Sequence, residues 1–245
     1  MREREAKMIV TDTFELPDLS DAIPGAELGD ATEWTADDVY HDTADLRLAR
    51  WGCTIRHRDG DGWTVKIPKP STGLVLDRIE VAFGGSREAP PVRALNLVGS
   101  LTRGAEVGEV AQLRTRRVRR VWTGEDGEAV AELTDDTVRG TARIGESTFR
   151  EIEVELAEHE DQRRLSTVIE RLEQVRPSDE GPIPKAVRVL GPASLEPPDV
   201  VVAALPAKPT ARDVIRSALA ASVAQFLLQL PGARLGIDPE GVHQA

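Results

Sequence analysis

The stretch Glu151-Ile152-Glu153-Val154-Glu155-Leu156 alternates an acidic with an apolar side chain at every step. Such alternation is typical of a β-strand, because successive side chains of a strand point to opposite faces. Half-buried strands usually turn apolar residues inward and polar residues toward water. A charged face need not meet bulk solvent, however. The alternative is a barrel with a charged interior, whose apolar exterior is covered by helices.

Short alternating runs recur through the first 160 residues and predict eight strands. They cover residues 3–10, 39–43, 53–58, 63–68, 75–83, 107–122, 128–134 and 148–156. The sequences Asp59-Gly60-Asp61-Gly62 and Gly124-Glu125-Asp126-Gly127 each separate two runs and are typical of hairpin turns. We therefore predict an α+β fold, an eight-stranded antiparallel β-barrel that forms a tunnel and ends in a short C-terminal all-α fragment. Flanking helices are predicted at 17–23, 91–101 and 160–174.

Charged residues two positions apart share one strand face in five of these runs. The basic set is Lys7, Arg56, Arg58, Lys66, Arg78, Arg114 and Arg116, and the acidic set is Glu3, Glu5, Glu80, Glu151 and Glu153, with Asp135 or Asp136 nearby. A charged interior is tolerable only where both signs are present and something fills it. Lysine and arginine suit phosphate oxygens, whereas clustered carboxylates suit Mg²⁺ or Mn²⁺. Together they meet the requirements for metal-assisted attack on a polyphosphate.

Taken singly, each charged pair is explained most simply as a solvated strand face with surface ion pairs. Its repetition over five strands favours a shared charged interior. The run from Arg114 to Arg120 contains five arginines and could suggest nucleic acid, but Trp122 is its one aromatic neighbour and the chain is acidic overall. No specific nucleic acid partner is therefore expected. We also expect the tryptophans to pack in the outer core and not to act as stacking platforms: Trp34, Trp51, Trp63 and Trp122.

The chain has 245 residues, of which 42 are acidic and 31 basic, so its formal net charge is −11. Such a chain is a poor general binder of nucleic acid or anionic membrane. Its single cysteine, Cys53, excludes an internal disulfide and a multi-cysteine zinc site and fits a reducing compartment. The first residues lack the apolar segment of a signal peptide, and the apolar stretch 218–230 is short and interrupted for a bilayer span. We expect a cytoplasmic protein with no membrane partner.

The composition changes after residue 190, where five prolines between 191 and 209 predict an extended linker. Thr210 is a good N-cap, Asp213 stands at the capping-box position, and a wide apolar stripe follows. One helix cannot bury that stripe alone. Asp238-Pro239 resembles a second helix start. We interpret residues 210–245 as part of a larger helical domain. The alternative is a two-helix appendage that packs on the barrel or on another chain.

Several of these motifs resemble those of the CYTH family, the triphosphate tunnel metalloenzymes. Glu3-Arg4-Glu5-Ala6-Lys7 has the family's Glu-x-Glu-x-Lys pattern, and residues 40–48 with Gly52 and Arg56-His57-Arg58 are similar to its next conserved stretch. The segments 63–66, 78–80, 114–116 and 151–156 follow in the family's order, with Arg114 where the family often has lysine. The resemblance covers roughly residues 1–190. After Pro209 the chain looks like the beginning of a CHAD domain, a helical module associated with polyphosphate, with His243 in its histidine position.

The resemblance implies a CYTH-like tunnel domain over 1–190, a linker over 191–209 and a CHAD-like fragment over 210–245. It implies a metal-dependent hydrolase that splits a linear triphosphate, with inorganic triphosphate favoured, into diphosphate and phosphate. The implied ligands of Mg²⁺ or Mn²⁺ are Glu3, Glu5 and Glu153, with Glu151 and either Asp135 or Asp136 as further candidates. The implied phosphate-binding residues are Lys7, Arg56, Arg58, Lys66, Arg78, Arg114, Arg116 and Lys185.

Lys7 and Glu80 are the residues that the resemblance implies in catalysis, with Glu80 orienting the basic groups or assisting water. Lys185 would come from a short helix that plugs one end of the tunnel, although Pro184 stands where the family often has serine. Several alternatives stay open: a polyphosphate-binding module without turnover, a thiamine triphosphatase or adenylate cyclase of the same family, and a scaffold that self-associates through its C-terminal helix. The CYTH–CHAD pairing favours inorganic triphosphate over thiamine triphosphate, and no adenine-binding feature stands out.

Overall fold

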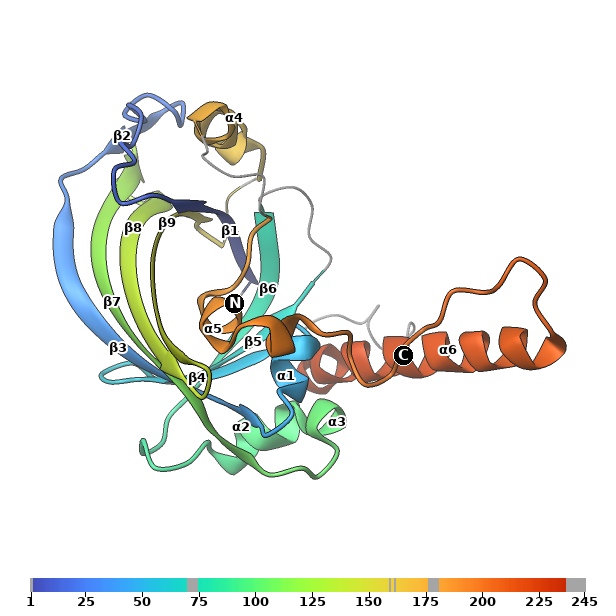
Figure 1. Ribbon diagram of the computed structural model, residues 1–245. Coiled ribbons are helices and arrows are strands. Elements are labelled where there is room, and N and C mark those ends of the chain that lie inside the picture. The colour runs from blue at the N-terminus through green and yellow to red at the C-terminus, as the bar shows by residue number, and fades with distance from the viewer. Residues whose placement is uncertain (1, 70–74, 159, 161, 176–180, 237–245) are drawn as a thin grey trace.

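A computed structural model describes residues 2–69, 75–158, 160, 162–175 and 181–236 of the chain (Figure 1). Eight strands close into an antiparallel barrel in the order β7-β3-β4-β5-β6-β1-β9-β8, because β8 pairs back onto β7. A short additional strand, β2 (Ala26–Leu28), pairs with the far end of β7 beyond β3. The predicted eight-stranded antiparallel barrel with flanking helices is therefore confirmed.

The barrel strands follow the predicted runs closely at six of eight positions and are much longer at the other two. Their bounds are β1 (Arg2–Val10), β3 (Thr32–Thr43), β4 (Thr54–Arg58), β5 (Gly62–Pro68), β6 (Val75–Phe83), β7 (Val107–Gly124), β8 (Ala129–Ala142) and β9 (Gly145–Leu156). The polar start of β3 and the end of β8 lack an alternating apolar pattern. They are strands because they pair along almost the whole length of β7, which spans 18 residues.

Apolar residues on the outer faces of the strands form two cores beneath covering elements. One core lies between β1, β8 and β9 and the helix α4 (Ser166–Val175), which follows the 3-10 turn η1 (Gln162–Leu165). The other lies over β4, β5 and β6, beneath α1 (Arg47–Arg50), α2 (Val92–Leu97) and α3 (Gly99–Thr102). The predicted helix at 17–23 is wrong: the segment forms turns, in which the N–H groups of Ala22 and Ala26 bond to the carbonyls of Leu19 and Ile23. The apolar spacing of Leu19, Ala22 and Ile23 reflects burial against the barrel and not a helical face.

A short helix, α5 (Lys185–Leu190), lies within the ring of strands and fills part of the barrel interior (Figure 1). Its buried side chains pack against inward-facing Tyr40, Leu113 and Val138. Gly140 on β8 makes this approach possible, since a Cβ built there would lie 2.8 Å from Cγ1 of Val189 and closer still to Cγ2. The interior is thus apolar where α5 sits and charged beyond it.

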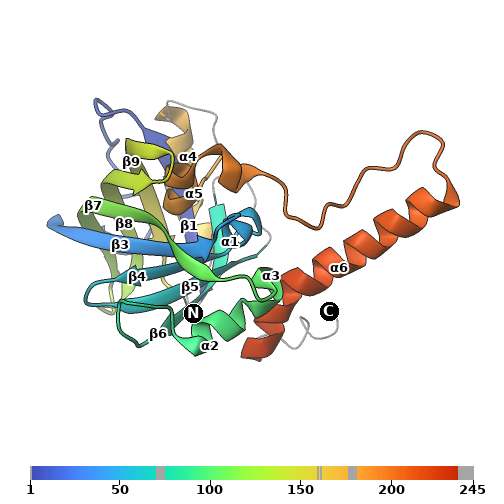
Figure 2. The same ribbon diagram turned by 60° about the horizontal axis from the view of Figure 1, so that its bottom comes forward.

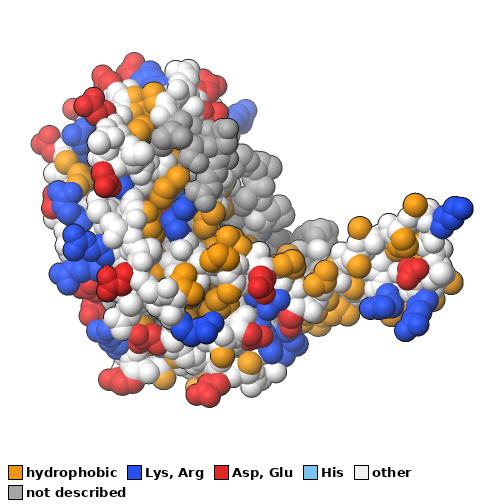
Figure 3. All heavy atoms as spheres, viewed as in Figure 1, with side chains coloured by type: hydrophobic (Ala, Val, Ile, Leu, Met, Phe, Trp, Pro, Cys, Tyr) orange, Lys and Arg blue, Asp and Glu red, His pale blue; other side chains and the backbone are white. Residues whose placement is uncertain are grey.

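The C-terminal helix α6 (Ala211–Leu235) projects from the barrel, and its last turns contact α2 and α3 (Figure 2). Thr210 and Asp213 form the predicted capping box. Apolar residues including Ile215, Leu219 and Val223 are exposed along its projecting part (Figure 3). By length and composition alone this 25-residue helix, which extends beyond the stretch 218–230, is apolar enough to cross a membrane, and 11% of its most apolar window is buried in the fold. A single helix of this kind is weak evidence for a membrane span.

The connection that precedes α6 contains the 3-10 turn η2 (Pro192–Leu195) and then runs without a helix or strand to Thr210. The helix start predicted at Asp238 lies outside the described residues. The division into a tunnel domain, a linker and part of a helical domain stays a prediction.

Candidate functional site

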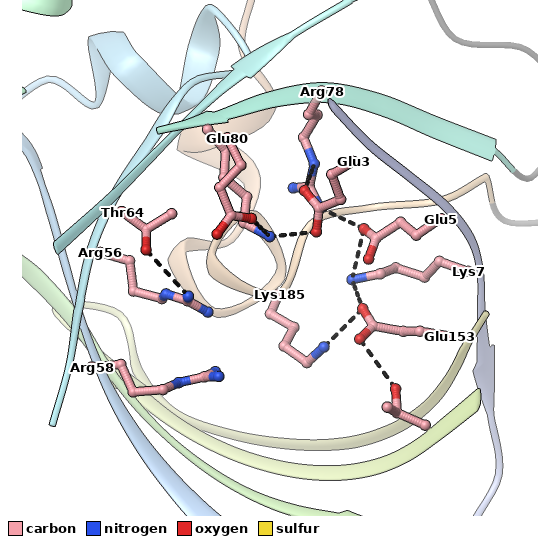
Figure 4. Close-up of polar contacts among 12 residues, drawn as sticks. Glu3, Glu5, Lys7, Arg56, Arg58, Thr64, Arg78, Glu80, Glu153 and Lys185 are labelled. Carbon is pink, nitrogen blue, oxygen red and sulfur yellow. Dashed lines mark hydrogen bonds and ion pairs between the residues drawn. The ribbon is translucent and has the colours of Figure 1, made fainter. Parts of the chain in front are cut away.

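A cavity of about 250 Å³ lies in the charged part of the barrel interior. Carboxylates and cations from six strands and from the start of α5 face one another across it (Figure 4). Its charged lining comprises Glu3, Glu5, Lys7, Arg56, Arg58, Asp61, Lys66, Arg78, Glu80, Arg117, Glu153, Glu155 and Lys185. The alternation of charged and apolar residues therefore places the charges inside and the apolar side chains beneath the covering elements.

One wall of the cavity is acidic and comes from β1 and β9. The two strands are antiparallel, with Glu5 opposite Glu155 and Lys7 opposite Glu153. The carboxylate of Glu3 lies 2.5 Å from Nζ of Lys66 and 3.2 Å from Nε of Arg78. Burial raises the pKa of Glu3, but the charges of Lys66 and Arg78 outweigh it and lower the pKa overall. Glu3 is therefore held as a carboxylate facing the cavity.

Carboxylate oxygens of Glu3, Glu5 and Glu155 lie within 4.8 Å of one another, close enough to share one ion. Among the described residues, Glu155 has no ion-pair partner. Burial, together with the charges of Glu3 and Glu5, raises the pKa of Glu155 to about 8. This group offers three carboxyl groups as oxygen ligands, one of them without a cation from the described part of the chain, which is the donor chemistry that Mg²⁺ and Mn²⁺ require. Glu155 was missing from the predicted ligands, although its shared strand face with Glu151 and Glu153 was a usable signal.

A second acidic group, Asp136, Glu151 and Glu153, is equally compact but is already paired with protein cations. Nζ of Lys185 lies 3.0 Å from Asp136, 2.5 Å from Glu151 and 2.8 Å from Glu153. Lys7 forms ion pairs with Glu151 and Glu153 as well. Burial lowers the pKa of Lys185, but the surrounding carboxylates outweigh it and raise the pKa well above its ordinary value. All three members of this second group are paired with protein cations, whereas in the first group Glu3 and Glu5 are paired with Lys66, Arg78 and Lys7 and, within the described ranges, only Glu155 is not. A metal ion would therefore displace fewer protein cations at Glu3, Glu5 and Glu155, so that group fits an ion better.

The opposite wall of the cavity is basic and comes mainly from β4. Arg58 donates two hydrogen bonds to Asp38, from Nε to Oδ1 at 2.7 Å and from Nη2 to Oδ2 at 2.8 Å. Nε of Arg56 lies 3.7 Å from the same carboxylate. Burial raises the pKa of Asp38, but the hydrogen bonds from Arg58 and the nearby arginine charges outweigh it and lower the pKa. Asp38 was not singled out from the sequence, yet it holds two inward-facing arginines in place.

Glu80, Lys66 and Lys185 all reach the cavity as the sequence predicted. Nζ of Lys66 lies 3.1 Å from Glu80 and so joins the carboxylates of β6 and β1. Pro184 caps the start of α5 with an extended backbone and lets Lys185 point into the charged space. The Pro-Lys departure from the family pattern therefore leaves the lysine in place.

Four predicted site residues do not line the cavity. Glu151 faces the barrel interior, where Lys7 and Lys185 pair with it, and the other three lie on the outer face. Arg114 and Arg116 are 69% and 57% exposed at their side chains, and each pairs with an acidic residue on the outer face of β3. Asp135 lies on the outer face of β8, where Arg150 binds it at 2.7 Å. Alternate side chains of a strand face opposite sides, and on β7 and β8 the inward-facing positions lie one residue from the predicted ones. Arg117 and Asp136 therefore point inward instead.

Of the two predicted alternatives Asp135 and Asp136, Asp136 points inward, and it pairs with Arg117, which was not predicted. Arg117 donates to Asp136 at 2.8 and 2.6 Å and to Glu153 at 3.1 Å. The run around Arg117 contains arginines at both parities, so its charge pattern alone could not identify the inner face. Burial of Leu113 and Thr115 at alternate positions in the folded barrel identifies the inner face.

Trp34 also departs from expectation. Its relative exposure is 40%, whereas Trp51, Trp63 and Trp122 are buried in the outer cores as predicted.

Two uncharacterized proteins from two strains of Mycobacterium tuberculosis are each 31% identical to this chain over 176 residues. The matched region covers 64% of this chain and 34% of each relative, so the chain spans about a third of the length of these curated relatives. A solved structure from Bacillus halodurans, described as a candidate adenylate cyclase, is 16% identical, with a TM-score of 0.37 and coverage of 72% of this chain and 92% of that one.

Another solved structure, from Hippeastrum, is described as a candidate adenylyl cyclase that reveals a dominant triphosphatase activity. It is 21% identical, with a TM-score of 0.40 and coverage of 73% of this chain and 92% of that one. A family model, the CYTH domain, matches residues 1–188, which is more than half of the chain. On that match, this chain belongs to the CYTH domain family.

Proposed function

We propose that this chain is a metal-dependent hydrolase of linear triphosphates, with inorganic triphosphate as its favoured substrate. The observation that supports the proposal is one cavity in which arginine and lysine face the acidic group Glu3, Glu5 and Glu155, where Glu155 has no ion-pair partner among the described residues. Cations of this kind bind phosphate oxygens, and the acidic group suits a divalent ion. Both are required for attack on a phosphoanhydride bond.

Glu3, Glu5 and Glu155 would hold the ion, with Glu151 and Glu153 as a second acidic position that Lys7 and Lys185 already occupy. When bound, Mg²⁺ or Mn²⁺ supplies charge neutralisation on the phosphate chain and activation of water. Which of the two ions acts is part of the proposal's test.

The chain's own residues would bind and orient the substrate. Arg56 and Arg58 would bind phosphate oxygens from the basic wall, and Arg117 replaces the excluded Arg114 and Arg116 in that role. Lys66 and Arg78 would bind beside the acidic wall. Fixed cations of this kind stabilise the charge that develops on the departing diphosphate. Lys7 and Glu80 would act nearest the reacting phosphate, with Glu80 keeping the ammonium of Lys66 in position.

The identity of the substrate and the roles of the remaining parts of the chain are likewise proposals. Thiamine triphosphatase and adenylate cyclase activities are alternatives within the family. The non-enzymatic alternative is a module that binds polyphosphate without hydrolysing it, since the same cations would bind a longer anion. Residues 210–245 would belong to a CHAD-like helical domain, α6 would allow self-association, and the protein would act in the cytoplasm.

The test is phosphate release from inorganic triphosphate, ATP, thiamine triphosphate and long-chain polyphosphate, each with Mg²⁺, with Mn²⁺ and with EDTA. We expect metal-dependent release that is fastest from inorganic triphosphate. Glu5→Gln should abolish turnover, because it removes a ligand charge, and Arg58→Ala should mainly raise KM. Tight binding of polyphosphate without phosphate release from any substrate would instead favour the binding module. Equal activity of both variants and wild type would contradict the site assignment.

A further inference from the structure

Trp34 is the one tryptophan of this chain that presents its ring to solvent. Its exposure of 40% contrasts with values of 7%, 0% and 0% for Trp51, Trp63 and Trp122, and all four lie in the described part of the chain. Tryptophan is highly buried on average, and exposed tryptophans are enriched where another molecule packs on them. The position of Trp34 relative to the cavity shows what kind of partner could do so.

The strand register places Trp34 on the tunnel side of β3. Trp34 is directly opposite Arg117 on β7, and side chains directly opposite in an antiparallel pair share one face, with Cβ atoms about 5 Å apart. Arg117 lines the cavity. The residues on either side of Trp34 confirm the parity, because Glu33 binds the outward-facing Arg116 and Thr35 is also opposite Arg116.

Trp34 lies at the end of the barrel that α5 does not fill. The helix α5 packs near the other end of β3, against Tyr40. The strand β4 pairs only with Asp38–His41 of β3, so the first residues of β3 extend beyond the end of β4 (Figure 2). Trp34 lies in this extension. The indole therefore stands at the end of the barrel away from α5, two residues along β3 from the inward-facing Ala36 and four from Asp38, which holds Arg58.

We propose that Trp34 is a stacking platform that lets the site bind triphosphates with a planar ring attached to one end, such as a nucleoside triphosphate, in addition to the favoured inorganic triphosphate. The inference rests on the proposed function, since the phosphates would occupy the cationic cavity while the ring stays at the mouth. The adjacent Arg117 guanidinium sits where the first phosphate would enter. Stacking of a base on an aromatic side chain tolerates every base, so the platform selects for a ring and not for one nucleobase.

The experiment compares Trp34→Ala and Trp34→Phe with wild type on ATP and on inorganic triphosphate, which has no ring. Thr35→Ala is the matched control, because Thr35 is the exposed neighbour on the outer face. We expect Trp34→Ala to raise KM for ATP by about five-fold or more relative to its effect on inorganic triphosphate. Trp34→Phe should restore most of the loss, because phenylalanine keeps an aromatic face, and Thr35→Ala should match wild type on both substrates.

A binding readout separates this inference from the proposed function. With EDTA present, ATP should shield tryptophan fluorescence from acrylamide more strongly than inorganic triphosphate does, since the other three tryptophans are buried. If wild type releases no phosphate from either substrate, the proposed function fails, and the quenching comparison still decides the role of Trp34. Equal effects of Trp34→Ala on both substrates, or equal shielding by both anions, would overturn the inference.

Discussion

Asp38 and Arg58 form a two-fold hydrogen-bonded pair across β3 and β4, with distances of 2.7 and 2.8 Å, inside the barrel. Asp38 is almost fully buried, whereas Arg58 reaches the cavity. The same carboxylate lies near Arg56. One buried acid thus orients two of the cations that would bind the substrate, because paired hydrogen bonds fix a guanidinium in a single plane.

We predict that Asp38→Asn raises KM for inorganic triphosphate by about ten-fold, with a smaller effect on kcat. The amide keeps the shape of the side chain but loses the charge that holds the two arginines, and a lost charge-assisted contact of this kind is worth roughly 1.5–3 kcal/mol. Steady-state phosphate release measures the effect. Asp37→Asn is the matched control, because Asp37 is exposed on the outer face, and it should behave as wild type. A fall in kcat with unchanged KM would contradict the positioning role.

We predict that Arg117→Ala lowers kcat/KM at least ten-fold, whereas Arg116→Ala leaves it within about two-fold of wild type. Arg117 faces the cavity and binds Asp136 and Glu153, while Arg116 binds Glu33 on the exposed face. The difference reflects loss of a phosphate contact and of a partner to two buried carboxylates. The measurement is kcat/KM for both variants with thermal denaturation alongside. The opposite ranking would show that the inward face of β7 is misassigned.

The contrast between Arg116 and Arg117 also shows how far sequence alone can go. Where a strand alternates strictly, as residues 151–156 of β9 do, the sequence identifies both the charged face and the apolar face, and several such strands predict the barrel. Along β7, arginines occupy both parities, so only the tertiary fold, through burial of Leu113 and Thr115, identifies the inner face. The same one-residue ambiguity separates Asp135 from Asp136. The strand face that Glu155 shares with Glu151 and Glu153 places it in the tunnel from sequence, but its position opposite Glu5 on another strand, which makes it a candidate ligand, comes from the fold.

We predict that Mg²⁺ or Mn²⁺ stabilises the fold and that Glu155→Gln reduces this effect. An ion at 100 times its Kd adds about 2.7 kcal/mol, which for a chain of this size raises Tm by roughly 5–10 °C. Thermal denaturation with and without the ion measures the shift. Glu146→Gln, an exposed change of the same charge on the same strand, is the control and should keep the full shift. A full shift in Glu155→Gln would place the ion elsewhere.

We predict that the metal-free protein becomes less stable as pH rises from about 4.3 to about 8, owing to Glu155. The pKa of this carboxyl is raised to about 8 by burial and by Glu3 and Glu5, whereas an unfolded glutamate has a pKa of about 4.3. Over this window the folded state binds more protons than the unfolded state, so the free energy of unfolding falls with rising pH, by at most about 1.4 kcal/mol per unit. Denaturant titrations in EDTA at several pH values measure the slope. Glu155→Gln should flatten it, and an unchanged slope in that variant would assign the effect to another group.

We predict that Gly140→Ala lowers both stability and turnover, and that adding Val189→Ala restores much of each. A Cβ at Gly140 would collide with both methyl groups of Val189 and push α5 away from β8. The backbone itself does not require glycine, since Gly140 is not among the residues with positive φ. Overpacking of this kind costs about 1–3 kcal/mol, and displacement of α5 would draw Lys185 away from Asp136, Glu151 and Glu153. Thermal denaturation and phosphate release measure the two effects.

Val189→Ala alone removes the collision partner and should lose only the stability of its missing methyl groups. The double variant relieves the collision but changes no charged residue. If it recovers turnover, the packing of α5 against β8 controls the position of Lys185. If instead Gly140→Ala keeps wild-type Tm and turnover, α5 does not depend on this contact.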